Sequence, residues 1–379
     1  MKKSILAVLH FSLSVLAFSQ ESEEKVNALT FSASYYGDFL GNTTGGIKKD
    51  FAYLGQGAIG LNLNTEAAGW WNGGELSISG MSTHGGTPTE TFIGDFQCVD
   101  NIEAGNHAFL SELWYKQQFA DKFSLTLGLQ DMNAEYAFCD AAADYINSSF
   151  GISSVFGNFG TPMFPITGLG LNLRWDISDK WAWQAGVYDG GILDFDENPY
   201  NIKWKLDKTK GYLTVTEAIF NKEDANHAGV YKLGVSYHTG EEDAVLYANI
   251  GQSLWSNDKH ELEAFTMAAY SFNANYSDDK DELAAAYFYN NFHIAAGLNL
   301  NGVFSKQQKD KLGVAFSTSL FRDFDKKGAH ETAIELTYKY QILEQLFVQP
   351  DLQYIVKPST KYAALDNAFV AMLRFGVEF

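Results

Sequence analysis

The sequence has 379 residues and a formal net charge of −19, with 27 Lys and Arg against 46 Asp and Glu. Aromatic residues make up 15% of the chain and charged residues 19%, and there are 34 Gly but only 6 Pro. The aromatic content argues against intrinsic disorder, and the acidic balance argues against nucleic-acid binding. Beyond the N-terminal segment, no apolar run reaches the roughly 18 residues of a transmembrane helix, so a large β protein is the leading class.

The N-terminal residues have the pattern of a secretory signal peptide. Lys2 and Lys3 precede an apolar stretch at 5–16 that is too short to span a bilayer, and residues 17–19 resemble a cleavage site. We therefore expect residues 1–19 to be removed and residues 20–379 to form one exported domain.

Two cysteines remain in the mature chain, Cys98 and Cys139. An oxidising compartment permits a disulfide between them, and two free thiols are the alternative. Their separation does not match a metal-binding spacing, so we expect no metal site.

Strict alternation of apolar and polar side chains is the main pattern of the chain. In the last segment, Phe369, Leu373 and Phe375 share one face, and Arg374 lies on the other. We predict sixteen strands, at 29–39, 51–63, 73–81, 106–119, 122–131, 167–177, 180–189, 227–239, 243–255, 260–273, 283–290, 292–300, 311–322, 329–341, 345–356 and 366–379. The segment 212–220 is either a further strand or a loop hairpin, and the tight turn near Asn291 is the weakest part of this assignment.

Strand length and the placement of aromatic residues favour a transmembrane antiparallel β-barrel over a soluble sandwich. Strands of about ten residues cross a bilayer when tilted, aromatic residues crowd the strand ends, and an even strand number suits a bacterial barrel. With the N-terminus in the periplasm, the short connections 120–121, 178–179, 240–242 and 342–344 are periplasmic. The long connections 82–105, 132–166, 190–226 and 357–365 then lie outside.

Motifs for other chemistry are weak. Residues 55–60 match G-x-G-x-x-G, but an alternating strand continues where a dinucleotide fold requires a helix. Residues 194–198 open like a calcium loop, yet Pro199 and Lys205 occupy its Gly and Glu positions, so a solvated acidic loop is the better interpretation. No hydrolase motif pairs the histidines, so we do not expect an enzyme.

Charged and aromatic side chains on inward faces of the predicted strands form the candidate channel lining. These residues are Glu112, Trp114, Lys116, Arg174, Lys232, Lys339, Asp351 and Arg374. Aromatic surfaces with neighbouring carboxylates and forked donors suit sugars, because sugars present both C–H faces and hydroxyls. A water-filled barrel interior also needs polar residues, so both interpretations stay open.

Several blocks of the sequence resemble the OprB-type carbohydrate-selective porins. These blocks are residues 94–97, 101–104, 112–115, 127–133, 147–150, 186–190 and 349–358, with Glu335, Tyr338 and the terminal Phe379. Asp131, in the fourth block, joins the candidate lining. Leu129 stands where the family often has a basic residue, so the sugar preference is not carried over.

The resemblance implies a sixteen-stranded bacterial outer-membrane porin for facilitated diffusion of small carbohydrates. It also implies contact with outer-membrane lipids and barrel-insertion machinery, in a monomer or trimer. We expect the loop 132–166 to fold inward and narrow the pore, so that weak wall contacts set selectivity. The alternatives are a general or other-solute channel and, less favoured, a barrel enzyme or a surface adhesin.

Overall fold

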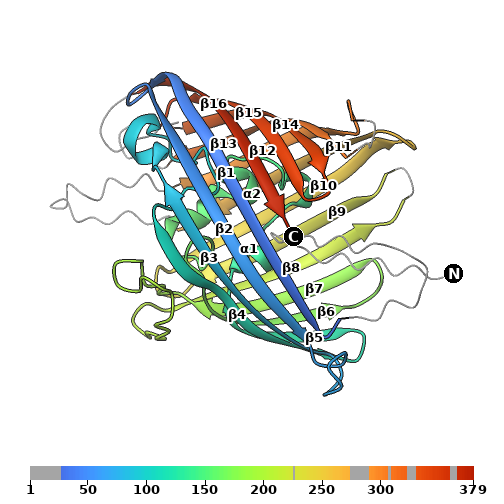
Figure 1. The fold of residues 1–379 in the computed structure, drawn as a ribbon. Coiled ribbons are helices and arrows are strands. Elements are labelled where there is room, and N and C mark those ends of the chain that lie inside the picture. The colour runs from blue at the N-terminus through green and yellow to red at the C-terminus, as the bar shows by residue number, and fades with distance from the viewer. Residues whose placement is uncertain (1–26, 225–226, 274–289, 306–308, 322–329, 359–364) are drawn as a thin grey trace.

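The computed structural model describes residues 27–224, 227–273, 290–305, 309–321, 330–358 and 365–379. They form a closed antiparallel barrel in which each strand pairs with its sequence neighbours and the last strand returns to the first (Figure 1). The signal peptide predicted at residues 1–19 lies outside the described residues. None of the helices in the described part of the chain is long and apolar enough to cross a membrane.

The sixteen strands are β1 (Leu29–Gly46), β2 (Asp50–Asn64), β3 (Gly74–Gly85), β4 (His107–Phe119), β5 (Phe123–Gln130), β6 (Gly168–Asp176), β7 (Trp181–Asp189), β8 (Tyr212–Lys222), β9 (Gly229–His238), β10 (Asp243–Ser256), β11 (Glu261–Ser271), β12 (Asn290–Asn301), β13 (Lys311–Phe321), β14 (His330–Leu343), β15 (Leu346–Val356) and β16 (Asp366–Glu378). In the described residues, the short helical turns lie in connections between strands: η1 (Thr89–Ile93), α1 (Met132–Glu135), η2 (Asp140–Ala142), α2 (Ser148–Gly151) and η3 (Ser154–Asn158).

The predicted strand number is confirmed, although the strands that make it up differ from the predicted list in two places. The segment left open at 212–220 is strand β8. The strand predicted at 283–290 has its residues 283–289 outside the described part, and Asn290 opens β12. Asn291, predicted to lie in a tight turn, is inside β12.

These changes alter the predicted sides of two connections. The end of the barrel that holds the C-terminus is here called the terminal end. It carries the turns that lead from an even-numbered strand to the next, odd-numbered strand, such as the turn from β4 to β5. The turn near 240–242 joins β9 to β10 and therefore lies at the opposite, loop end, not on the predicted side. The connection predicted at 190–226 is interrupted by β8, so only 190–211 is a long loop at that end.

The first and last strands close the barrel along a seam. Ser34 is opposite Glu378, and the pairing continues to Asp38 opposite Arg374. At the end of the seam, the backbone N–H groups of Ala33 and Phe379 each donate to the other residue's carbonyl, at 3.0 and 2.8 Å. Closure leaves no free sheet edge, which a barrel in lipid requires.

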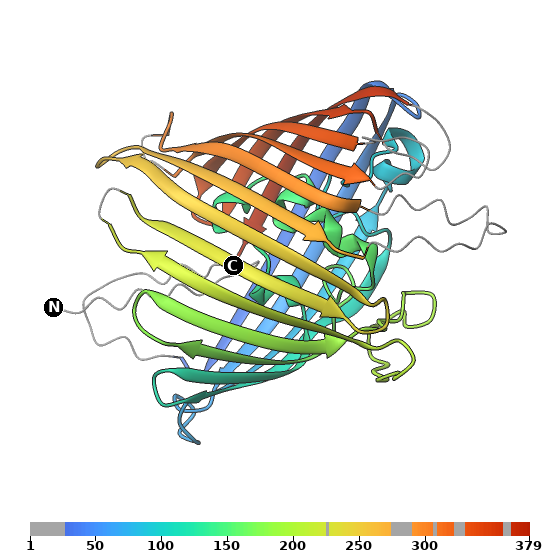
Figure 2. The same ribbon diagram turned by 180° about the vertical axis from the view of Figure 1, so that it is seen from behind.

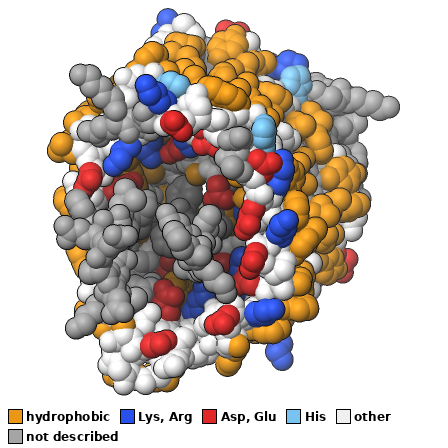
Figure 3. Space-filling model, turned by 90° about the vertical axis from the view of Figure 1, so that its right-hand side faces the viewer, with side chains coloured by type: hydrophobic (Ala, Val, Ile, Leu, Met, Phe, Trp, Pro, Cys, Tyr) orange, Lys and Arg blue, Asp and Glu red, His pale blue; other side chains and the backbone are white. Residues whose placement is uncertain are grey.

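Side chains alternate between the outside and the lumen as the sequence pattern predicts. Outward Leu171, Val314 and Leu373 are 49%, 48% and 45% exposed, whereas inward Arg374 and Gln184 are buried. Figures 2 and 3 show the result: strands form a continuous wall, and the terminal-end mouth is ringed by acidic and basic side chains while hydrophobic side chains cover the outside. An apolar exterior around a polar interior is the arrangement of a membrane barrel.

Candidate functional site

Two connections from the loop end fold into the barrel. The long inner loop, residues 131–167, carries α1, η2, α2 and η3, and the ribbon shows α1 and α2 inside the ring of strands (Figure 1). This agrees with the inward fold predicted for 132–166. The short inner loop, residues 86–106, also folds inward, which the sequence analysis did not predict.

Carboxylates on the inner wall hold the long inner loop by its backbone. Glu335 of β14 accepts hydrogen bonds from the N–H groups of Ile146 and Asn147, at 2.7 and 3.0 Å. Glu217 of β8 accepts one from the N–H of Ala137 at 3.2 Å. Since buried N–H groups must find acceptors, these contacts fix the loop against β8 and β14.

The short inner loop is held in the same way by a second carboxylate of β14, four residues before Glu335. Glu331 accepts from the N–H groups of Phe96 and Gln97, at 2.8 and 2.9 Å. Arg374 reaches from β16 to Asp100 at 3.1 Å while it pairs with Asp38 across the seam at 2.6 Å. One strand therefore anchors both inner loops, through carboxylates four residues apart.

An ion-pair bridge adds a third attachment to the long inner loop. Asp144 lies between Lys311 of β13 and Lys339 of β14, at 2.7 and 2.9 Å. Although burial opposes ionisation, the two ammonium groups hold the pKa of Asp144 well below its usual range. The carboxylate therefore stays charged at any pH the barrel meets in a cell.

Four of the predicted lining residues belong to this attachment system. Lys339 and Arg374 form the ion pairs described above, and Lys232 donates to the carbonyl of Phe138 at 3.1 Å. Asp351 accepts from Gln353 at 3.1 Å, and Gln353 in turn donates to the carbonyl of Val99 at 2.8 Å. They face the lumen as predicted, but they contact the loops.

Asp131 starts the long inner loop. Its carboxylate caps α1 by accepting from the N–H of Asn133 at 2.8 Å and also accepts from the N–H of Phe164 at 3.1 Å. This joins the beginning of the loop to its return. Burial raises the pKa of Asp131 to about 6. Its contacts make Asp131 a residue that closes the base of the loop.

The remaining candidates lie on the opposite wall, where their own side chains are only partly covered. Glu112, Trp114 and Lys116 follow one another on the inner face of β4, and the Trp114 Nε1–H points to Glu112 at 3.5 Å. Arg174 of β6 contacts Asp176 at 3.0 Å. The structure therefore places an indole between an acidic and a basic group along one strand.

A small recess joins this wall to the long inner loop. Lys116 and Arg174 line it together with Glu135 of α1. Burial raises the pKa of Glu135, and the two cations act against that rise. The sequence analysis did not identify Glu135 as a candidate residue. Glu135 lies in a loop after a strand, where the alternation of polar and apolar residues does not predict which way a side chain points.

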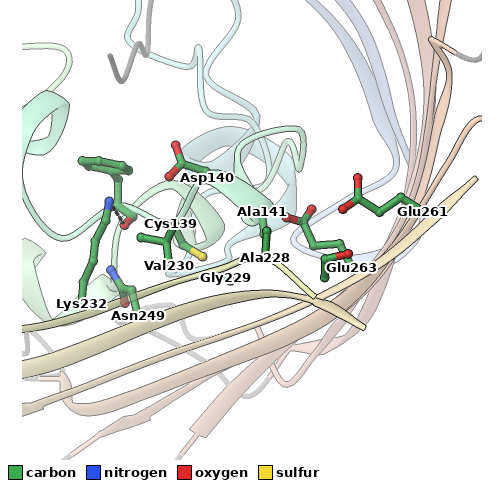
Figure 4. A pocket seen from close by; sticks show the side chains of 13 residues that line it. Cys139, Asp140, Ala141, Ala228, Gly229, Val230, Lys232, Asn249, Glu261 and Glu263 are labelled. Carbon is green, nitrogen blue, oxygen red and sulfur yellow. Dashed lines mark hydrogen bonds between the residues drawn. The ribbon is translucent and has the colours of Figure 1, made fainter. Parts of the chain in front are cut away.

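A larger recess, of about 130 Å³, lies between the long inner loop and β9–β11. Figure 4 shows Asp140 and Lys232 on one side of it and Glu261 and Glu263 of β11 on the other. The alternation of β11 could have identified the two glutamates as inward-facing. Asp140 and Cys139 come from the loop and carried no such signal.

The disulfide considered for Cys98 and Cys139 is absent from the structure, since both cysteines are free. The Cys98 thiol donates to the carbonyl of Asp100 at 3.2 Å, whereas the Cys139 thiol donates to the carbonyl of Ile250 at 3.7 Å. The Cys98 thiol therefore makes a contact within the short inner loop, and the Cys139 thiol joins the long inner loop to β10. Burial raises the pKa of both, and that of Cys139 to about 12, so neither is a reactive thiolate near neutral pH.

Comparisons with known proteins agree with this geometry. The family model described as "Carbohydrate-selective porin, OprB family" matches residues 48–379. Porin B of Pseudomonas aeruginosa is 24% identical over 92% of this chain and 87% of its own. The high-pH structure of Pseudomonas putida OprB superposes with a TM-score of 0.79 at 20% identity, covering 93% of this chain and 94% of that one. Salmonella typhi OmpF, solved in complex with daunomycin, gives a TM-score of 0.59 at 11% identity.

Proposed function

Because this chain belongs to the OprB family of carbohydrate-selective porins, which are outer-membrane channels and not enzymes, we propose that small sugars cross it along the wall formed by β2–β6. This wall is called the open wall below, and the loop-covered wall formed by β8–β16 is called the covered wall. The observation that carries the proposal is the row Glu112, Trp114 and Lys116, whose side chains are half-buried and face the lumen.

The chemistry of that row suits a sugar that slides. An indole offers a flat surface to sugar C–H groups, worth about 1 kcal/mol, while a carboxylate and an ammonium group exchange hydrogen bonds with hydroxyls. Contacts of this size favour entry without preventing exit, which facilitated diffusion requires. No cofactor or energy source takes part.

The inner loops supply the constriction. Since they fill the lumen against the covered wall, a solute is directed toward the open wall and loses water to side chains there. Asp140, Glu261 and Glu263 place negative charge beside the larger recess, so small cations should pass more readily than anions.

Single-channel recording of the protein in planar bilayers tests the proposal. Small sugars should interrupt the ion current in a concentration-dependent way, and amino acids of matched size should interrupt it less. Equal effects of sugars and size-matched amino acids would contradict a sugar track on the open wall and would support passage by size alone.

Membrane assembly follows from the same barrel. We propose that residues 1–19 are removed during export, that the apolar outer face contacts lipid, and that the terminal end with its closing Phe379 faces the periplasm and the insertion machinery. N-terminal sequencing tests cleavage, protease accessibility in whole cells tests orientation, and native electrophoresis decides between a monomer and a trimer.

A further inference from the structure

The larger recess, between the long inner loop and β9–β11, holds more negative than positive charge. Its charged side chains are Asp140, Lys232, Glu261 and Glu263, so three carboxylates stand against one ammonium group. Lys232 already contacts the loop, because it donates to the Phe138 carbonyl at 3.1 Å and its Nζ lies 3.0 Å from the centre of the Phe138 ring. Among the salt bridges of the described residues, none involves the three acids. The recess therefore keeps negative charge that a positively charged ligand can meet.

Glu261 and Glu263 follow one another on the inner face of β11, and the neighbouring strand holds them in position. Asparagine side chains of β12 donate to them, at 3.2 Å for Glu261 and 3.3 Å for Glu263. Lys311 of β13, whose charge also acts on Glu263, is paired with Asp144 at 2.7 Å. In Figure 4 both glutamates point from the barrel wall into the recess. Two fixed carboxylates on one strand suit an ammonium group, which donates to both.

Two uncharged side chains of the recess have polar atoms without a hydrogen-bond partner. Asn249 and Ser253 lie on the inner face of β10, line the recess, and are 3% and 5% exposed. The amide nitrogen of Asn249 and the hydroxyl of Ser253 are both buried and unpartnered. Figure 4 shows the amide of Asn249 directed from the sheet toward the long inner loop. Because a buried donor without an acceptor is unfavourable, these groups favour a ligand that brings acceptor oxygens.

The size of the recess limits the ligand to a small solute. Its volume of about 130 Å³ is roughly ten times the 10–15 Å³ that admits one water molecule, so a single sugar ring fits. A ligand that matches all three features carries one positive charge, several hydroxyl oxygens and one ring.

We propose that the recess binds an amino sugar, a hexose with an ammonium group in place of one hydroxyl. The ammonium group lies between Glu261 and Glu263, and the sugar hydroxyls accept hydrogen bonds from Asn249 and Ser253. Since Glu261 opens β11 at the terminal end, the site lies at that mouth, on the covered wall. This inference rests on the proposed passage of small sugars, to which it adds a charged class of sugar and a second place of contact.

Equilibrium binding to the refolded mature barrel in detergent tests the proposal. Isothermal titration at pH 6 and constant ionic strength should show glucosamine binding about tenfold more tightly than glucose, because charge-assisted hydrogen bonds are added. N-Acetylglucosamine has the same ring without the charge and should bind like glucose. Glu261→Gln and Glu263→Gln should each abolish most of the preference for glucosamine. Asn249→Ala should weaken glucosamine binding about fivefold, for one lost hydrogen bond.

Asp258→Asn is the matched control. Asp258 is an exposed acid in the turn before β11 and does not line the recess, so this variant should prefer glucosamine as strongly as the wild type does. Equal loss of the preference in Asp258→Asn and Glu263→Gln would overturn the site, because the general charge of the mouth would then attract the amine.

Two further results would overturn the amino-sugar site. One is equal affinity of a folded wild-type barrel for glucosamine and glucose, which would mean that water satisfies Asn249 and Ser253. The other is methylammonium binding as tightly as glucosamine, which would reduce the recess to a cation site. If Glu263→Gln does not fold, the Glu261→Gln titration decides.

Current recordings separate this inference from the proposed function. If neutral sugars interrupt the current more than amino acids do, but glucosamine binds no better than glucose, only the recess fails. If glucosamine binds with the stated dependence on Glu263 while sugars and amino acids interrupt the current equally, the track on the open wall fails and the recess stands.

Discussion

The two walls of the barrel face each other across the lumen and use polar residues for different purposes. On the covered wall, the buried side chains of Glu331, Glu335 and Glu217 accept hydrogen bonds from backbone N–H groups of the inner loops. On the open wall, Glu112 and Lys116 remain partly accessible. Inward-facing charges in this barrel therefore differ in how much of their hydrogen bonding goes to the inner loops, and the three buried glutamates of the covered wall lie at one extreme.

Arginine substitutions at three positions would test the contrast most severely. Ile78→Arg places a charge on the lipid side of the open wall, where Ile78 is 44% exposed, and should destabilise the barrel by about 2–4 kcal/mol. Ser77→Arg faces the lumen beside Trp114 and should assemble normally. Val370→Arg also faces the lumen, but Val370 is 1% exposed under the inner loops and should fail like Ile78→Arg.

Folding yield, measured as the fraction that migrates as the compact form on unheated gels, reports all three variants. Equal assembly of Ser77→Arg and Val370→Arg would remove the distinction between the walls.

Removal of an anchor should release a loop. Glu335→Ala leaves the N–H groups of Ile146 and Asn147 without acceptors and should cost about 3 kcal/mol, because two hydrogen bonds to a buried charge are lost. Single-channel conductance should rise and become noisy as the long inner loop moves. Glu331→Ala is the matched comparison, since it frees the other loop. A quiet channel of unchanged conductance in Glu335→Ala would contradict the anchoring role.

The ion-pair bridge predicts a defined pH dependence. Asp144→Asn leaves Lys311 and Lys339 without their shared carboxylate and should cost about 1–2 kcal/mol at pH 7. Because the folded-state pKa of Asp144 is lowered, this difference should be constant above pH ~5 and shrink below pH ~4, where the unfolded carboxyl takes up its proton. Thermal unfolding of both proteins from pH 7 to pH 3 measures it. A difference that grows on acidification would show the wrong sign.

Loss of one surface from the open wall should change transport more than stability. Trp114→Ala removes the indole and should weaken sugar affinity about fivefold, for a contact of roughly 1 kcal/mol, while ion conductance stays equal or rises slightly. Sugar titration and conductance on the same channels test this. An unchanged sugar constant would assign Trp114 to packing beneath the loop.

The smallest effect is expected at the cysteines. Because burial raises both thiol pKa values, Cys98 and Cys139 should react slowly with iodoacetamide at pH 8 in the folded barrel and quickly once it is denatured. Non-reducing mass spectrometry of exported protein should find two free thiols. A disulfide would show that the inner loops approach each other more closely than the structure has them.

Alternation predicted the barrel well because most strands meet lipid on one side and polar surroundings on the other. It left β8 open between a strand and a loop hairpin. There inward Leu213, Val215 and Ile219 are buried under the long inner loop and outward Thr214 and Thr216 are polar, so the usual relation between polarity and face is reversed. The inward direction of the candidate lining residues was predictable because they lie on strands in which polar and apolar side chains alternate.

The division of those residues between anchors and the open wall was not predictable. Lys339 and Lys116 both alternate inward, yet only the folded loop decides which of them meets Asp144. Contacts of this kind join residues far apart in sequence, and a local pattern carries no information about them.

The seam has a consequence for biogenesis. Since β1 pairs with β16 and Ala33 exchanges hydrogen bonds with Phe379, the two strands at the ends of the sheet complete the wall together. Translation runs from β1 to β16, so the first strand is made earliest and finds its second partner last. Until then the nascent sheet has two bare edges that invite mispairing. The Asp38–Arg374 ion pair spans this junction. Because a shifted register would separate the two charges, we expect the pair to favour correct alignment of β1 with β16 as the ring closes.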